Sequence, residues 1–339
     1  MKTAVVLFNL GGPDSLKAVK PFLFNLFSDP AIIRFPRLFR FLLASWLSRK
    51  REHEASEIYQ HIGGRSPIFP NTQKQVDALQ NVLGENFKVF AVMRYWHPRA
   101  EEVFHKVKSY DPAQVILLPL YPQFSSTTTA SSFQEWQDMC QQKQWNKPTR
   151  KICCYPTQPQ FIEATTKLLK DKLSLFSSLE KVRVLFSAHG LPQRIVNQGD
   201  PYQWQIERSV SEILRHLGKP ILDYVVCYQS RVGPLKWLEP YTDVEITRAG
   251  NDGISLVVVP ISFVSEHSET LYELDIQYKK LATEAGVPRY ERVSTLGIES
   301  AFISGLADLI KNNKLPIDFT PRICPTQFCL CINSGFKDD

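Results

Sequence analysis

Two segments of the sequence place titratable side chains directly after short apolar runs. In SAHGLP, His189 follows the run VLF and lies beside a glycine. In PISFVSEHSETLYELD, three further groups crowd the end of another such run, namely His267, Glu269 and Glu273. Imidazole and carboxylate together suit ferrous iron as ligands, and a histidine near neutral pKa can also accept a proton. These residues are therefore candidates for metal handling and proton transfer.

The same residues have ordinary structural interpretations. His189 alone could be a turn residue at a strand end. Glu269 and Glu273 are four residues apart, so on a helix they share one face, which Gln277 continues. A solvated acidic helix start, favoured by the helix dipole, would look the same. The carboxylates become more informative because His189 occupies an equivalent strand end elsewhere in the chain.

Aromatic, hydroxyl and arginine side chains gather in three other segments, AVMRYWHP, LPLYPQFSSTTTASS and YVVCYQSRVGPLKWLEPYT. The candidates in them are Arg94, Tyr95, Tyr121, Ser125 and Trp237. Flat rings with positive charge and hydroxyls suit a flat anionic ligand, and a Ser/Thr run at a helix start suits carboxylates. Core packing and helix capping explain the same composition, so these residues alone do not identify a ligand.

The elements that would position these groups alternate along the chain. The predicted strands are near-continuous apolar runs, typical of a parallel sheet buried on both faces, and helical patterns separate them. The strands are expected at Thr3–Leu10, Lys88–Met93, Gln114–Leu120, Val182–Ser187, Leu222–Tyr228 and Ser255–Ile261, with helices such as Asn71–Leu83, Glu101–Ser109 and Gln203–Leu217. This alternation predicts an α/β doubly wound architecture.

The chain also resembles itself. VVLFNLGGP near the start is similar to VLFSAHGLP, and VILLPLYPQFSSTT is similar to LVVVPISFVSEHSET. We expect an N-terminal α/β lobe over residues 1–152, a similar C-terminal lobe over 153–318 and a cysteine-containing tail over 319–339. Ligands of such sheets lie beyond the carboxyl ends of the strands, which predicts a site in a cleft between the lobes.

Bulk composition excludes several classes of protein. The 339 residues carry 43% hydrophobic and 22% charged residues and a mild net charge of +6, with no nucleic-acid-reading motif, so no nucleic-acid partner is expected. The sequence contains no run of 18 apolar residues, so no transmembrane helix is expected. The N-terminal apolar run ends in a turn and indicates a buried strand instead of a signal peptide. We therefore expect a cytoplasmic protein, which could also bind peripherally to the inner face of the membrane.

Eight segments in order and spacing resemble the ferrochelatase family, over roughly residues 5–310. They are FNLGGPDSL, IGGRSPI, MRYWHP, PLYPQFSSTT, FSAHGLP, NQGDPY, CYQSRVGPLKWLEPYT and PISFVSEHSETLYELD. The resemblance implies two similar Rossmann-like lobes, each a parallel sheet flanked by helices, and insertion of Fe(II) into protoporphyrin IX to form protohaem. It implies that His189 and Glu269 carry metal insertion and that His267 and Glu273 line the adjoining polar path.

By the same resemblance, Arg94, Tyr95, Tyr121, Ser125 and Trp237 would shape the porphyrin pocket. Whether His189 is the base, the first metal ligand or both stays open. The alternatives are a coproporphyrin ferrochelatase, a cobalt chelatase, or a two-lobed protein that binds metal or haem without chemistry. Two positions depart from the eukaryotic pattern, because Gln277 stands where an acidic residue often extends the carboxylate line and Ser126 where animal enzymes carry a cluster cysteine.

Three of the seven cysteines, Cys324, Cys329 and Cys331, lie in the last sixteen residues. In a reduced compartment such a group indicates a metal before a disulfide. We expect a [2Fe–2S] cluster, with zinc and an unliganded tail as the alternatives. Similarity to bacterial ferrochelatases that use an internal cysteine makes Cys154 the expected fourth ligand, although Cys153 adjoins it.

The segment 32–51, IIRFPRLFRFLLASWLSRKR, combines apolar residues at helical spacing with six basic residues. Leu38, Leu42 and Trp46 are four residues apart, and Phe39, Leu43 and Leu47 repeat this spacing one step on. An apolar face with flanking cations is typical of a helix lying on an anionic membrane surface. A helix packed on its lobe is the alternative.

Overall fold

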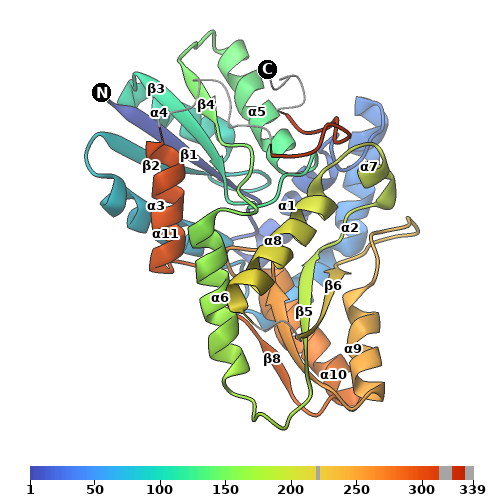
Figure 1. Cartoon of the computed structure of the whole chain (residues 1–339). Helices are drawn as coiled ribbons and strands as arrows, with labels where there is room; N and C mark the ends of the chain where they lie inside the picture. Colours follow the sequence, from blue (N-terminus) through green and yellow to red (C-terminus); the bar gives the residue numbers. More distant parts are fainter. Residues whose placement is uncertain (219–221, 313–322, 333–339) are drawn as a thin grey trace. The chain divides into compact units, whose positions relative to one another are not determined.

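The computed structural model describes residues 1–218, 222–312 and 323–332 (Figure 1). Its contacts divide the chain into two compact units. The first unit comprises Met1–Cys154 together with residues 306–312, and the second comprises Tyr155–Gly305 together with residues 323–332. The observed division falls two residues after the expected one at 152/153. It also differs later in the chain, where 306–312 return to the first unit and the described tail joins the second.

The first unit contains a parallel sheet with the strand order β2-β1-β3-β4. Its strands are β1 (Thr3–Asn9), β2 (Phe87–Met93), β3 (Gln114–Pro119) and β4 (Thr149–Lys151). Every residue of β1 is buried, as a central strand covered on both faces requires. Its helical elements are η1 (Leu16–Ala18), α1 (Val19–Phe27), α2 (Arg37–His61), α3 (Ile68–Leu83), α4 (Ala100–Tyr110) and α5 (Thr129–Gln142).

The second unit repeats this plan with the strand order β6-β5-β7-β8, again all parallel. The strands are β5 (Val182–His189), β6 (Asp223–Gln229), β7 (Ser255–Pro260) and β8 (Tyr290–Arg292). The helical elements are α6 (Pro159–Leu173), α7 (Gln193–Asn197), α8 (Tyr202–Leu217), α9 (Thr242–Asn251), η2 (Glu269–Tyr278), α10 (Lys279–Glu284) and the beginning of α11 (Ser300–Lys311), whose residues from 306 onward belong to the first unit. In this unit α6 and α8 lie on one side of β5, and α9 and α10 lie on the other (Figure 1).

The two parallel sheets confirm the expected α/β fold class with two Rossmann-like lobes. All six predicted strands and the three example helices are present. The sequence analysis missed β4 and β8, because strands of three residues, TRK and YER, carry no apolar run. The predicted cleft between the lobes stays a prediction.

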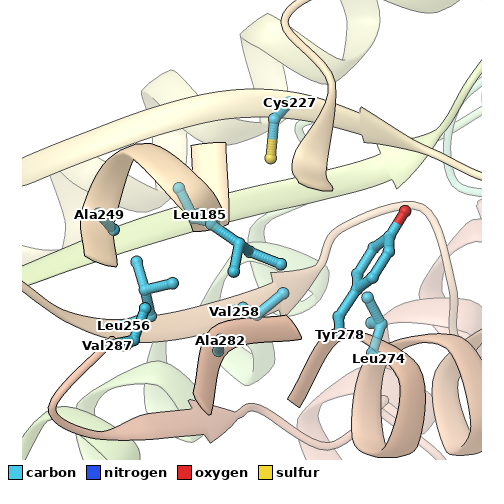
Figure 2. Close-up of a cluster of buried hydrophobic side chains, with 10 residues drawn as sticks. Leu185, Cys227, Ala249, Leu256, Val258, Leu274, Tyr278, Ala282 and Val287 are labelled. Atoms are coloured by element: carbon cyan, nitrogen blue, oxygen red, sulfur yellow. The ribbon is translucent and has the colours of Figure 1, made fainter. Parts of the chain in front are cut away.

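One face of the second sheet is closed by an apolar cluster that α9, η2 and α10 share with the strands (Figure 2). Leu185 and Val258 come from β5 and β7, while Leu274 and Tyr278 come from η2. All four side chains are buried. Burial of Leu274 and Tyr278 fixes which face of η2 packs on the sheet, and therefore which of its residues remain available for chemistry.

Candidate active site

His189 is the last residue of β5, where the strand reaches the carboxyl edge of the sheet. Its Nδ1 lies 2.6 Å from the carbonyl oxygen of Gly190, so this nitrogen carries a proton and donates it to that carbonyl. The backbone is held on both sides, because its N–H donates to Ser262 Oγ and its carbonyl accepts from the Tyr202 hydroxyl. The ring is therefore fixed with Nε2 as the nitrogen that can take up a proton or bind a metal.

Gly190 is required by the close approach of two neighbours. A Cβ at this position would lie 2.8 Å from the Gln229 carbonyl oxygen and 3.1 Å from the ring of Trp237. The missing side chain lets the indole of Trp237 pack beside His189, with ring centroids 6.5 Å apart. Of the expected pocket residues, the structure thus brings Trp237 to the predicted catalytic histidine.

Glu269, the first residue of η2, lies between two imidazoles. Its Oε1 is 3.6 Å from His189 Nε2, and its Oε2 is 3.5 Å from His267 Nε2. His267 is also fixed by its other nitrogen, since Nδ1 lies 2.9 Å from the Ser265 carbonyl oxygen. Its side chain is 7% exposed, against 39% for His189. Both imidazoles therefore turn Nε2 towards the Glu269 carboxylate, and of the two only His189 is open to a ligand.

This arrangement shifts the acid–base behaviour of the carboxylate. Burial alone would raise the pKa of Glu269, but the facing His189 and the hydrogen-bonded His267 lower it to about 2. Burial alone would lower the pKa of His267, yet Glu269 raises it above its usual value. Glu269 is therefore ionised at neutral pH, as a group that attracts a metal cation must be.

Glu273 lies on the same helix but is enclosed by protein donors. Its Oε1 accepts from the Ser230 N–H at 2.9 Å and from the Tyr278 hydroxyl at 3.0 Å. Its Oε2 accepts from the Ser230 hydroxyl at 2.5 Å and from the Gln229 amide at 3.0 Å. Burial and the negative charge of Glu269 raise its pKa. A metal could bind Glu273 only by displacing some of these donors.

The helix that carries both carboxylates is a π-helix over Glu269–Tyr278, not the α-helix that their four-residue spacing suggested. Single π-type turns in proteins concentrate at functional sites. Beside η2 a cavity of about 420 Å³ is lined by Ser230, Glu273 and Gln277 among others. Of the predicted polar path, Glu273 lines this cavity together with Gln277, whereas His267 and Glu269 do not; the path stays a prediction.

Two of the expected pocket residues of the first unit, Arg94 and Tyr95, belong to a hydrogen-bonded network around a buried acid that the sequence analysis did not single out, Asp29. Arg94 lies 2.7 Å from Asp29 and 3.1 Å from Glu135. The hydroxyls of Tyr95 and Ser131 donate to the same Asp29 oxygen at 2.8 and 2.7 Å. Tyr95 is only 1% exposed, so its ring acts in packing and orientation. A role of Arg94 and Tyr95 against porphyrin stays a prediction.

Tyr121 and Ser125 follow β3 in the loop that leads into α5. The Ser125 hydroxyl lies 3.0 Å from the Thr127 hydroxyl and accepts from the Thr127 N–H. Burial raises the pKa of Tyr121, which stays neutral. The expected helix start at the Ser/Thr run is confirmed, since α5 begins within the run at Thr129.

Sequence reasoning missed the residues that hold the site together, chiefly Asp29, Gln229 and Ser230. Gln229 ends β6 just as His189 ends β5, and Ser230 follows it, so the strand-end signal was present there. Ser230 also adopts a positive φ of 64°, which turns both its N–H and its hydroxyl towards Glu273. No sequence pattern at this serine indicates that conformation.

Solved structures of tetrapyrrole chelatases share the fold. The sirohydrochlorin chelatase SirB from Bacillus subtilis subspecies spizizenii, solved in complex with cobalt, aligns with a TM-score of 0.54 at 10% identity, covering 93% of this chain and 97% of that one. SirB from Bacillus subtilis with Fe³⁺ aligns with a TM-score of 0.50 at 14% identity, covering 98% and 97%. At such identities the similarity concerns the fold alone.

Sequence comparison is more specific. The ferrochelatase family model matches residues 2–314. The ferrochelatase of Wolbachia sp. subsp. Drosophila simulans (strain wRi) is 53% identical over 316 residues, covering 92% of this chain and 99% of its own. That of Pelagibacter ubique (strain HTCC1062) is 46% identical over 345 residues, covering 98% and 99%. The chain belongs to the ferrochelatase family.

Proposed function

We propose that this protein inserts Fe(II) into protoporphyrin IX and releases protohaem, with His189 and Glu269 as the catalytic pair. The observation that carries the proposal is the Glu269 carboxylate, with Nε2 of His189 and of His267 at 3.6 and 3.5 Å. Both imidazoles donate Nδ1–H to a backbone carbonyl, the outer-shell arrangement typical of histidines that meet metals. Membership of the ferrochelatase family supplies the substrate class.

The geometry divides the work between the two groups. Insertion requires that iron lose its water and that two pyrrole N–H protons leave the ring. Glu269, with a pKa of about 2, is a poor proton acceptor at neutral pH and a good oxygen donor to a cation. His189 is the more exposed imidazole and presents Nε2, so it is the group able to take the two pyrrole protons one after the other, passing each to solvent. The ferrous ion is a substrate here, and it passes through the site.

Turnover tests the proposal directly. Purified protein, kept free of oxygen, is mixed with ferrous iron and protoporphyrin IX, and haem formation is followed by absorbance. A parallel panel replaces protoporphyrin with coproporphyrin and iron with cobalt. Haem formation with protoporphyrin supports the proposal. Preference for coproporphyrin or cobalt reassigns the substrate, and tight porphyrin binding without turnover reduces the protein to a binding module.

We also propose that the start of α2 contacts an anionic membrane. Leu38, Phe39, Leu42 and Trp46 are 69%, 64%, 63% and 55% exposed, so this apolar stripe is not packed on the protein. In the described ranges every helix is too short or too polar to cross a bilayer. The exposed apolar stripe and its neighbouring arginines favour a helix that lies in the interface.

Flotation with phosphatidylglycerol vesicles tests this contact. Leu42→Glu combined with Trp46→Glu should abolish binding, because charge would enter the apolar layer. The matched control is Leu175→Glu with Leu179→Glu, which alters two other exposed apolar residues. Equal binding by wild type and by the α2 variant would show that this face is not the contact.

The [2Fe–2S] cluster remains a prediction that the placed thiols do not support. Cys324 accepts a hydrogen bond from Gln205, and Cys329 donates to the Gln198 carbonyl. Within the described residues, no three or more His, Cys, Asp or Glu side chains are arranged to hold a metal ion; this applies to the placed thiols and also to the catalytic groups, through which iron passes as a substrate. A [2Fe–2S] cluster needs four protein ligands, and the described residues do not bring four together, so the cluster has no part in the proposed mechanism.

Colour and composition decide the matter. Protein purified without oxygen should be brown and contain about two iron and two labile sulfide per chain if the cluster exists. Bound zinc without sulfide indicates the alternative metal, and colourless, metal-free protein refutes both. Loss of colour in Cys324→Ser but not in Cys154→Ser would retain the cluster and reject Cys154 as the fourth ligand.

A further inference from the structure

Arg292, the last residue of β8, forms a bridge between two carboxylates of the second unit. Its Nε and one terminal nitrogen bind both oxygens of Asp275, at 2.7 and 2.6 Å. Its other terminal nitrogen donates to Glu266 Oε1 at 2.8 Å. The three side chains are 11%, 35% and 22% exposed respectively, so the guanidinium is the enclosed member. A bidentate contact between a guanidinium and a carboxylate fixes the orientation of the two groups as well as their distance.

The two carboxylates lie on either side of the candidate catalytic groups. Glu266 immediately precedes His267, and Asp275 follows Glu273 on η2. One guanidinium thus connects both ends of the segment that presents His267, Glu269 and Glu273. Glu266 is tied further, since the same oxygen accepts from the Thr295 N–H at 2.9 Å.

A second side chain of β8 holds the same helix. The Tyr290 hydroxyl donates to the Leu274 carbonyl at 2.8 Å, one residue before Asp275. The Leu274 side chain packs into the apolar cluster together with Tyr278 (Figure 2). Helix η2 is therefore fixed by apolar contacts through these two side chains and by polar contacts to β8.

We propose that Arg292 is a positioning residue, which sets the place of Glu269 relative to His189 by bridging Glu266 and Asp275. Its hydrogen bonds go to Glu266 and Asp275, so it acts through the segment that carries Glu269. The inference rests on the proposed function of this site and adds a determinant of its geometry. Lysine cannot replace arginine in this role, because a single ammonium cannot span both carboxylates with the same fork of donors.

The second unit offers a matched control. Arg183 in β5 also bridges two carboxylates, Asp223 at 2.9 Å and Asp252 at 3.1 Å, and its side chain is 10% exposed. It lies near the beginning of its strand, whereas His189 ends that strand. Arg183→Lys should thus cost similar stability without moving the carboxyl-edge groups.

The experiment compares Arg292→Lys with Arg183→Lys in the full-length protein. Three quantities are measured: kcat for iron insertion, the Kd for protoporphyrin IX by fluorescence quenching, and amide hydrogen exchange of the peptide spanning 266–278. A displacement of about 1 Å at a reacting group can cost on the order of 100-fold in rate. We expect Arg292→Lys to lower kcat roughly 10- to 100-fold and to speed exchange in that peptide. Porphyrin Kd should change less than about twofold.

Arg183→Lys should leave kcat and the exchange of that peptide unchanged. The inference is overturned if Arg292→Lys retains wild-type kcat and exchange, or if both variants lower kcat equally. Should Arg292→Lys fail to fold, Asp275→Asn weakens the same bridge from its other end, and unchanged exchange and kcat there would also overturn it. If the wild-type protein shows no turnover, the proposed function is refuted instead. Hydrogen exchange then still tests whether Arg292 holds the segment 266–278 in place.

Discussion

At the scale of single residues, the site depends on how each imidazole is held. His189 and His267 both donate Nδ1–H to a carbonyl in their own loop, which leaves Nε2 facing Glu269. They differ in access, because His267 is buried and His189 is partly open. The buried imidazole therefore supports the charge of Glu269, while the open one can exchange protons with a substrate.

Removing either member of the catalytic pair should stop turnover while sparing porphyrin binding. We expect His189→Ala to lower kcat at least about 100-fold, the usual contribution of a positioned base. Glu269→Gln should cause a similar loss, because a neutral amide does not attract the cation. Protoporphyrin affinity, measured by fluorescence, should remain near wild type. His216→Ala, an exposed histidine of α8, is the control, and normal turnover in His189→Ala would reject the assignment.

The low pKa of Glu269 predicts how stability depends on pH. Its pKa falls from an ordinary 4.5 to about 2 on folding, so its ionised form stabilises the folded state fully above about pH 5. That contribution, on the order of 2 kcal/mol, is lost as pH falls towards the folded pKa. Urea unfolding of wild type and Glu269→Gln should therefore differ most near pH 6 and converge only at about pH 2, where the folded-state pKa is reached. A difference that grows on acidification would contradict this sign.

The sequence indicated where the candidate reactive groups lie better than what surrounds them. His189 ends one strand and Glu269 follows another, both strands are visible as apolar runs, and parallel strands bring their carboxyl ends together. The four hydrogen bonds that protein donors make to the Glu273 carboxylate were not predictable, because two of them require the left-handed backbone of Ser230. The near-complete burial of Tyr95 likewise depends on Asp29, which is distant in sequence.

At the scale of elements, the short edge strand β8 and the helix η2 depend on each other. Helix η2 is opened to π-type pairing, a geometry that isolated sequence seldom favours. Its polar neighbours Tyr290 and Arg292 come from a strand of three residues. Sequence analysis found the acidic pattern but neither the π-helix nor its partner strand, since both arise from tertiary contacts.

The turn after β5 gives an element-scale prediction. In Gly190→Ala the new Cβ would lie 2.8 Å from the Gln229 carbonyl oxygen and 3.1 Å from the Trp237 ring, so β6 or the indole must move. Overpacking of this kind costs about 1 to 3 kcal/mol. We expect a lower melting temperature and a loss of turnover, because His189 adjoins the turn. A variant with wild-type melting temperature and activity would show that this turn tolerates a side chain.

At the scale of the whole molecule, the two units repeat one design and use it differently. Pro119 pairs with Phe8 in the first sheet, and Pro260 pairs with Ser187 in the second. This register makes Leu10 the counterpart of His189 and Gly11 the counterpart of Gly190. The internal similarity read from the sequence is thus confirmed by the strand order, and the imidazole marks where the second unit departs from the repeat.

The return of the chain to the first unit is the feature that the sequence division missed. Arg150 of β4 donates to the carbonyls of Leu309, Ile310 and Asn312 at the end of α11. These are carbonyl groups that a helix end leaves without intrahelical partners, and a cation stabilises that end of the helix dipole. Residues 306–312 therefore belong with the first unit because a buried arginine of β4 holds the last turn.

Arg150→Met keeps the apolar stem and removes these donors. Hydrogen bonds to a charged group contribute about 1.5 to 3 kcal/mol, so the free energy of unfolding should fall by about that amount. In a unit of this size, each kcal/mol corresponds to roughly 2 to 4 °C in melting temperature. Lys311→Ala, which removes one exposed contact to the Val82 carbonyl, should cost much less. Turnover per folded molecule should survive in both variants at low temperature, since neither residue contacts His189 or Glu269. If Arg150→Met has the same melting temperature as wild type, the end of α11 is held by its apolar contacts alone.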